Sequence, residues 1–381
     1  MLPDHNQIRK QFPFMEKITY LDSAHYTPYP LRSVEKINEF IKDFTTDYLN
    51  LSLVNINKAR ELRQTFGKLI NAKPENIIIT SNTTHGINIF ANGIVLKPGE
   101  NNVAILDSEF PAVVYPWLNQ EKLGRVNVLL IPSDKGYANE AMIRRILIDY
   151  NVNVFTLSYV QFLGYRHSIK SIAEFCRKYN ILLVVDAIQA TGIVPIDVED
   201  MCIDYLCTGN QKWMMSPAGL GFTYISKRYR ELVQPTYVGT TSIKYDFDNF
   251  LNYNLDFNED GTAFENSTLN TLAMIGTNEV LTYFMELGIE NIYNHIIEIQ
   301  DRIIEKLDTS KYRVESDLSP KHRSNILIFT NLDPAKNKTV QKSLEGKKIY
   351  IALREGYLRV SPHIYNNYND AEQLAKELNS L

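Results

Sequence analysis

The chain has 381 residues, 44% hydrophobic and 22% charged, with a formal net charge of −4 at pH 7, enough for one large core and a smaller second one. It has no run of lysines and arginines interleaved with aromatics and no stretch of about 18 apolar residues, which excludes the usual nucleic-acid, lipid-surface and transmembrane signatures. We therefore expect a cytoplasmic protein without a secretory signal, acting on a small molecule, with no nucleic-acid or membrane partner.

From about residue 17 to residue 235, short β-branched runs alternate with amphipathic stretches, which is typical of a parallel sheet flanked by helices. Apolar residues recur at helical spacing at 57–71 and 168–179, and these two segments are predicted as helices. Seven strands are predicted, at 77–79, 103–106, 128–131, 154–157, 181–185, 205–207 and 221–225.

The remainder of the chain predicts a second unit. Residues 244–261 lack periodicity and are predicted as a long surface loop or a crossover that contacts a partner. Residues 17–265 are predicted as the large cofactor-binding domain, and residues 1–16 with 266–381 as the small domain, joined by a long helix from about 268. Elements of this second part are helices at 269–287, 288–307, near 338 and at 370–381, and strands at 325–329, 348–352 and 357–360.

Two residues at the ends of predicted strands indicate the chemistry. Asp186 ends the apolar run 181–185, and Lys212 follows the next predicted strand, in a turn of small and polar residues. Pyridoxal phosphate needs an anion at its pyridine nitrogen and a partly desolvated amine for its aldehyde. Each residue alone has an ordinary explanation, as a turn aspartate or a surface lysine. Their order and placement predict a pyridoxal-phosphate enzyme in which Lys212 is the Schiff-base lysine.

Further positions suit the rest of this cofactor and its substrate. Thr83 and Thr84 open a predicted helix, so hydroxyl and backbone N–H groups converge where a phosphate can bind. Phe110 lies just past a predicted strand, where an aromatic ring can stack on a flat cofactor. Arg359 interrupts an apolar strand, and its guanidinium suits a bidentate grip on a substrate α-carboxylate. The structural alternatives are an N-cap threonine, a core phenylalanine and an internal salt bridge.

Together these motifs resemble the class V aminotransferase family of fold-type I pyridoxal-phosphate enzymes, which includes cysteine desulfurases and isopenicillin N epimerase-like proteins. The resemblance implies an α/β fold, with a mostly parallel seven-stranded sheet between helices and a small C-terminal α/β domain. It also implies a homodimer that binds pyridoxal 5′-phosphate and an amino acid. The matching segments span nearly the whole chain, at 20–24, 80–88, 109–117, 185–189, 212–213, 264–268 and 358–366.

Matching positions imply individual roles. Gln189 would donate to the phenolic oxygen of the cofactor, and Gln211 would replace a histidine that usually binds its phosphate. Thr268 matches a residue that reaches the phosphate of the neighbouring subunit. Phe110 stands where desulfurases carry a histidine, so stacking is kept while an acid–base role of that ring is lost. The implied cofactor-binding set is Thr83, Thr84, Phe110, Asp186, Gln189, Gln211 and Thr268 around the catalytic Lys212, with Arg359 and His25 at the substrate.

One departure from the family narrows the reaction. Desulfurases carry a persulfide-forming cysteine on a mobile loop shortly before the substrate-binding arginine, and the corresponding stretch 352–357 has none. The three cysteines, Cys176, Cys202 and Cys207, are predicted in or beside core elements and include no C-x-x-C pair, so neither a disulfide framework nor a metal site is encoded. We therefore predict an aminotransferase or a C–S or other β-elimination lyase, with cysteine desulfurase disfavoured.

Other readings stay open at this point. Epimerisation would need a second base on the opposite face of the substrate, for which His25 and Tyr26 are the candidates, although His25 also suits a polar loop. A nucleotide-binding α/β protein is disfavoured because the glycine-rich phosphate motifs are missing from the sequence. A binding protein that keeps the fold without turnover is disfavoured because both Lys212 and Arg359 are present.

Overall fold

A seven-stranded sheet forms the centre of the computed structural model, which describes residues 2, 4–97, 99–244, 249, 251 and 253–381. The strand order is β2-β8-β7-β6-β5-β3-β4, and all neighbours are parallel except at β8, which runs antiparallel to β2 and β7. The seven predicted strands are confirmed as β2 (Ile77–Thr80), β3 (Asn102–Leu106), β4 (Asn127–Ile131), β5 (Val154–Ser158), β6 (Leu182–Asp186), β7 (Tyr205–Gly209) and β8 (Gly221–Ile225).

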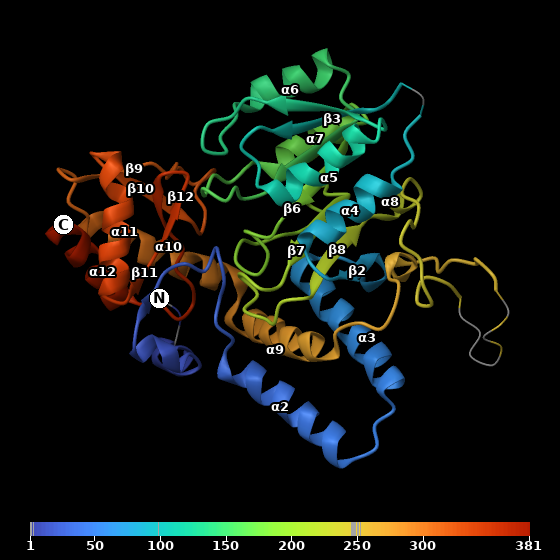
Figure 1. Cartoon of the computed structure of the whole chain (residues 1–381), viewed down its shortest axis with the longest axis horizontal. Helices are drawn as coiled ribbons and strands as arrows, with labels where there is room; N and C mark the ends of the chain where they lie inside the picture. Colours follow the sequence, from blue (N-terminus) through green and yellow to red (C-terminus); the bar gives the residue numbers. More distant parts are fainter. Residues whose placement is uncertain (1, 3, 98, 245–248, 250, 252) are drawn as a thin grey trace.

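Helices cover both faces of this sheet, because its strands are apolar on both sides and successive side chains point to opposite faces (Figure 1). One core lies under α4 (Thr83–Gly93), α5 (Pro111–Lys122) and the short α8 (Lys227–Arg230). The other core lies under α3 (Leu51–Ile70), α6 (Glu140–Asp149), α7 (Ile169–Lys178) and α9 (Thr271–Leu287). Because helices cover both faces, the edge formed by the carboxyl ends of the parallel strands is where a ligand can bind.

The C-terminal part folds around a second sheet with its own core. This antiparallel sheet has the order β12-β13-β10-β9, and a separate parallel pair joins β1 to β11. The predicted small α/β unit is confirmed. The strand predicted at 325–329 lies at 327–331, the one predicted at 348–352 is divided into 349–350 and 352–354, and the strand at 312–314 was not predicted. The elements of this unit are β9 (Tyr312–Val314), β10 (Leu327–Asn331), β11 (Ile349–Tyr350), β12 (Ala352–Arg354), β13 (Tyr357–Val360), α10 (Ile289–Lys306), α11 (Asn337–Gly346) and α12 (Tyr368–Ser380).

The N-terminal segment connects the two parts of the chain. Helix α1 (His5–Lys10) lies beside α12, where Arg9 Nη1 is 2.7 Å from Asp370 Oδ2, and β1 (Thr19–Tyr20) pairs with β11. Helix α2 (Leu31–Thr46) then packs on α9 beside α3, and α2 and α3 project from the large sheet in Figure 1. The division into residues 17–265 and a small domain of 1–16 with 266–381 stays a prediction.

The predicted loop at 244–261 falls partly on positions 245–248, 250 and 252, which lie outside the described residues. Its described ends come together, because Ile243 and Phe257 form an isolated antiparallel bridge. A 3-10 helix, η3 (Gly261–Phe264), follows and leads toward α9. Among the helices that the structure describes, none combines the length and the apolar character that a membrane span requires.

Candidate active site

Asp186 and Lys212 lie at the carboxyl ends of two neighbouring strands of the large sheet: Asp186 is the last residue of β6, and Lys212 lies in the turn that follows β7. Asp186 ends β6, where it is buried and its Oδ1 accepts the backbone N–H of Ile188 at 2.9 Å. Burial raises the pKa of the Asp186 carboxyl to about 6, against the opposing charge of Lys212. Burial lowers the pKa of the Lys212 amine to about 8, while Asp186 works in the other direction. Half of the Lys212 amine is therefore neutral near pH 8, in the form that attacks a carbonyl.

A free hydroxyl lies at the start of α4. Thr83 Oγ1 is buried and has no hydrogen-bond partner in the part of the chain that the structure describes, and Thr84 is half-buried in the same turn. A β-carbon at Gly209 would lie 3.3 Å from Thr83 Oγ1 and 2.6 Å from Gln211 Oε1, so these two side chains flank a space that only a glycine leaves open. An unpaired hydroxyl, the N–H groups of a helix start and an amide at one glycine suit a phosphate group.

Phe110 lies beside the reactive amine. Phe110 is 46% exposed, and Lys212 Nζ lies 5.6 Å from its ring centroid. The ring also meets Phe162 edge to face, with centroids 6.0 Å apart. An exposed aromatic face next to Lys212 suits stacking against a planar cofactor, as the sequence predicted.

Glu109 links the two loops that carry Phe110 and Phe162. Its buried carboxylate accepts the backbone N–H of Ser158 at 2.8 Å, the Ser158 hydroxyl at 2.5 Å and the amide of Gln161 at 2.6 Å. Burial raises the pKa of the Glu109 carboxyl to about 7, against these hydrogen bonds. Sequence reasoning gave Glu109 no role, although an acid between a strand end and an aromatic residue is a usable signal for a buried anchor.

Arg359 is held inside the molecule by the N-terminal segment. Its Nη2 donates to Asp22 Oδ1 at 3.1 Å and its Nη1 to the carbonyl of Phe162 at 3.0 Å, and the residue is 2% exposed. Burial lowers the pKa of the guanidinium, which the charge of Asp22 opposes. The internal salt bridge raised above as an alternative is thus present. Arg359 Nε is also buried and has no partner among the described residues, so its N–H is available to a ligand.

Gln189 already has two protein partners. Its Nε2 donates to the carbonyl of Ala24 at 3.1 Å, and its Oε1 accepts the indole N–H of Trp213 at 2.7 Å. The side chain therefore ties the turn after Lys212 to the N-terminal segment. Donation to a phenolic oxygen stays a prediction, and the second N–H of Nε2 is the group that would make it.

Two residues without a predicted role support the Lys212 turn. The Thr27 hydroxyl donates to the carbonyl of Lys212. His363 is buried, its Nδ1 accepts the N–H of Ile364 at 2.8 Å, and its Nε2 donates to the carbonyl of Trp213 at 3.0 Å. Burial lowers the pKa of His363 to about 3, so the ring stays neutral. His363 lies in the matching segment 358–366, which was the available signal, whereas Thr27 had none.

His25 and Tyr26 lie at the edge of this site. The His25 side chain is 59% exposed, and its Nδ1 is 3.6 Å from Asp22 Oδ2, on the carboxylate that also holds Arg359. Tyr26 is 45% exposed, and its ring meets that of His25 edge to face at 5.8 Å. The structure therefore brings His25 close to the arginine proposed for substrate binding and leaves its ring open to solvent.

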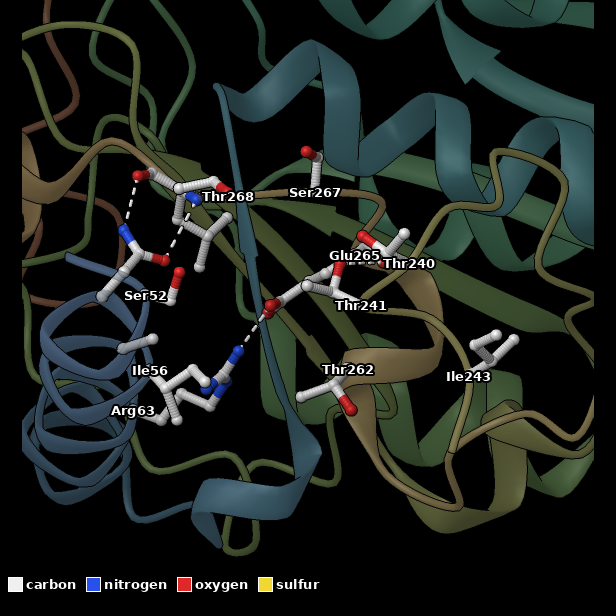
Figure 2. A pocket seen from close by; sticks show the side chains of 13 residues that line it. Ser52, Ile56, Arg63, Thr240, Thr241, Ile243, Thr262, Glu265, Ser267 and Thr268 are labelled. Carbon is white, nitrogen blue, oxygen red and sulfur yellow. Dashed lines mark hydrogen bonds and ion pairs between the residues drawn. The ribbon is translucent and has the colours of Figure 1, made fainter. Parts of the chain in front are cut away.

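Thr268 lies on a different surface. It is exposed and borders a cavity of about 390 Å³, shown in Figure 2, and a second cavity of about 180 Å³ that also touches Ser81 and His85. Within the larger cavity, Arg63 Nη2 and Glu265 Oε2 form an ion pair at 2.5 Å (Figure 2). Thr268 thus faces open space rather than the packed interior, which suits contact with a group from outside this chain.

The three thiols lie in or beside core elements, and Cys207 pairs with Asp186 in the large sheet. Cys176 and Cys207 are buried in α7 and β7, and Cys202, which is partly buried, occupies a turn between β6 and β7. Burial raises the pKa of Cys176 to about 12 and raises that of Cys207 further. Neither buried thiol can ionise readily near neutral pH, as a persulfide-forming nucleophile must.

A family model agrees with this arrangement. The aminotransferase class V model matches residues 19–374. The chain belongs to the aminotransferase class V family. It is a pyridoxal-phosphate-dependent enzyme of the aminotransferase or C–S lyase type, as the motifs predicted.

Relatives of this class V enzyme carry both kinds of name. An uncharacterized aminotransferase of Schizosaccharomyces pombe is 27% identical, over 97% of this chain and 94% of its own length. A probable cysteine desulfurase of Methanothermobacter thermautotrophicus is 26% identical, over 98% of this chain and 97% of its own length. The names of these relatives therefore do not distinguish transamination from C–S cleavage.

Solved structures show the same fold. A cysteine desulfurase from Thermococcus onnurineus superimposes with a TM-score of 0.86 at 21% identity, covering 99% of this chain and 98% of its own. A mutant of the enzyme C-DES, with glycine covalently linked to its pyridoxal-phosphate cofactor, superimposes with a TM-score of 0.88 at 21% identity, covering 97% and 98%. At this identity the likeness establishes the fold-type I architecture of this class V enzyme.

Proposed function

We propose that this enzyme binds pyridoxal 5′-phosphate covalently at Lys212 and acts on an α-amino acid by transamination. The observation that carries the proposal is the partly desolvated Lys212 amine, with the buried Asp186 nearby and an exposed face of Phe110 beside it. Elimination at Cβ, including C–S cleavage, is the second candidate, because both reactions begin with removal of the Cα proton.

The contacts described above support a role for each residue in this proposal. Bound pyridoxal phosphate supplies an electron-withdrawing ring that makes the Cα proton of an amino acid acidic. Asp186 holds a proton on the pyridine nitrogen, since its own carboxyl is ionised above about pH 6. Lys212, once its amine is free, removes the Cα proton and returns it at another atom. Thr83, with Thr84 and Gln211, binds the phosphate.

Substrate positioning falls to Arg359. Its unpartnered Nε and its fixed orientation on Asp22 suit an α-carboxylate placed beside the Lys212 amine. Sulfur transfer lacks a suitable nucleophile here. The buried thiols of Cys176 and Cys207 resist ionisation, and Cys202 precedes β7, at the opposite end of that strand from Lys212. Epimerisation needs His25 or Tyr26 as a second base, and among the described residues no hydrogen bond, ion pair or ring contact joins either side chain to Lys212.

We also propose a cytoplasmic homodimer. Apolar side chains are exposed on α2, on the connection from α2 to α3, at the start of α3 and in the segment before η3, and Thr268 borders a cavity that a second copy could reach. The exposed apolar residues in question are Phe44, Tyr48, Leu53, Tyr237, Tyr253 and Leu255. Three free cysteines fit a reducing compartment. Sedimentation at micromolar protein should give twice the chain mass, and a fully active monomer would contradict the dimer.

The test of the proposed function is the visible spectrum of the purified holoenzyme. We expect a yellow protein whose colour is bleached by borohydride, and a Lys212→Ala variant that lacks this response. Amino acids should change the spectrum, and 2-oxo acids should appear when an amino acceptor is supplied. Release of pyruvate and ammonia without an acceptor would favour elimination. A colourless protein that stays colourless with added cofactor would contradict the whole assignment.

A further inference from the structure

A second arginine, Arg354, lies on the same β-hairpin as Arg359. Arg354 ends β12, and only Glu355 and Gly356 separate it from Tyr357 at the start of β13. Both turn residues have positive φ, 46° and 82°, as a two-residue type I′ hairpin turn requires. This two-residue turn therefore fixes the backbone of Arg354 relative to β13.

The strand register places Arg354 on the same sheet face as Arg359. Ala352 pairs with Arg359, and Arg354 pairs with Tyr357, so the two arginines are diagonal neighbours across the hairpin. The charge of Arg354 also reaches the reactive amine: burial is the main cause of the lowered pKa of Lys212, and Arg354 adds to that shift. It contributes in the same direction to the lowered pKa of Arg359.

The guanidinium of Arg354 lacks an acidic partner within the described part of the chain. Its one hydrogen bond runs from Nη1 to the carbonyl of Leu353 at 3.0 Å, and the side chain is half-buried. Arg359, by contrast, is paired with Asp22. The two arginines and this one aspartate leave one positive charge uncompensated beside Lys212. A neutral amino acid does not balance that charge, whereas an amino acid with an acidic side chain carries a net charge of −1 at neutral pH.

We propose that Arg354 binds an anionic group at the end of the substrate side chain, so that the enzyme acts on α-amino acids with a second acidic group. This inference rests on the proposed function, with Arg359 on the α-carboxylate. A carboxylate or a sulfinate supplies the planar or oxygen-rich acceptor that a guanidinium fork binds. The short hairpin serves this purpose because it leaves little freedom for the arginine backbone.

The test is binding by the holoenzyme, followed through its visible spectrum. L-aspartate, L-glutamate and L-alanine are titrated into the wild type, Arg354→Gln, Arg354→Lys and the control Arg145→Gln, whose arginine is 82% exposed on α6. We expect an acidic amino acid to bind at least tenfold more tightly than alanine to the wild type. Arg354→Gln should remove that preference and leave the affinity for alanine within twofold of the wild-type value. Arg354→Lys should keep part of the preference for acidic amino acids. Arg145→Gln should match the wild type.

Calorimetry with succinate and butyrate separates this inference from the proposed reaction, because neither compound has an amine. Tighter binding of succinate that depends on Arg354 would support the anionic subsite even if no amino acid were turned over. Equal binding of succinate and butyrate would overturn the inference. An equal loss of affinity for aspartate and for alanine in Arg354→Gln would also overturn it. A spectrum that changes with alanine but not with either acidic amino acid would overturn the inference and leave the proposed function standing.

Discussion

Arg359 Nη2 lies 3.1 Å from Asp22 Oδ1, and this ion pair joins the N-terminal segment to the C-terminal sheet. The neighbouring backbone follows the same connection, because Asp22 and Ser361 form a parallel bridge. Both side chains are largely buried, at 3% and 12% exposure. The arginine that we propose for the substrate is therefore also a structural contact between distant parts of the chain.

Removal of one partner of this pair should cost stability. Arg359→Ala leaves the Asp22 carboxylate largely buried without its counter-charge, and we expect the free energy of unfolding to fall by about 3 kcal/mol. Asp22→Asn combined with Arg359→Ala should recover part of that loss. Urea denaturation of the two variants measures the difference. A double variant no more stable than Arg359→Ala would mean that the lost packing, and not the unpaired charge, causes the cost.

Covalent attachment of the cofactor should depend on the pH at which Lys212 loses its proton. With its pKa lowered from 10.5 to about 8, the amine becomes neutral as pH rises through 8. The rate at which the apoprotein takes up pyridoxal phosphate should therefore rise about tenfold from pH 6 to pH 7 and level off above pH 8. Stopped-flow absorbance follows this rate, with Lys212→Ala as the control. A rate still rising steeply at pH 9.5 would indicate an ordinary lysine.

A methyl group at Gly209 should interfere with the phosphate site. Its carbon would lie 2.6 Å from Gln211 Oε1 and 3.3 Å from Thr83 Oγ1. We expect Gly209→Ala to weaken cofactor binding about tenfold, at the lower end of the cost of overpacking. Gly346→Ala is the matched control, since a β-carbon there meets no atom within 4 Å. Binding of pyridoxal, which lacks the phosphate, should change less, and an equal loss for both compounds would argue against this location.

The thiols should be dispensable for catalysis. Replacing Cys176, Cys202 and Cys207 together by alanine removes two buried side chains, so some stability should be lost. Specific activity of the folded enzyme should stay within about twofold of the wild type, because no thiolate takes part. Mass spectrometry after exposure to L-cysteine provides the opposing readout. A persulfide on the wild type that one of these substitutions abolishes would restore the desulfurase assignment.

The sequence by itself determined the central sheet and the positions of Asp186 and Lys212 near the ends of two of its strands. Strands that are buried on both faces appear as continuous apolar runs, so β2 to β8 could be predicted from local pattern. Asp186 and Lys212 follow such strands directly, and strand ends are where open α/β sheets bind ligands. The position of Phe110 near Lys212 could be predicted for the same reason, because Phe110 follows the end of β3.

Only the tertiary structure determined which distant residues support the site and how its buried charges are paired. The bonds from Asp22 to Arg359, from Thr27 to Lys212 and from His363 to the Trp213 carbonyl join residues more than 140 positions apart, and no local periodicity encodes them. The position of Arg354 beside Arg359 likewise depends on a hairpin register that side-chain composition does not reveal. Local pattern fixes which residues lie at strand ends, whereas the balance of buried charges arises only when separate segments pack together.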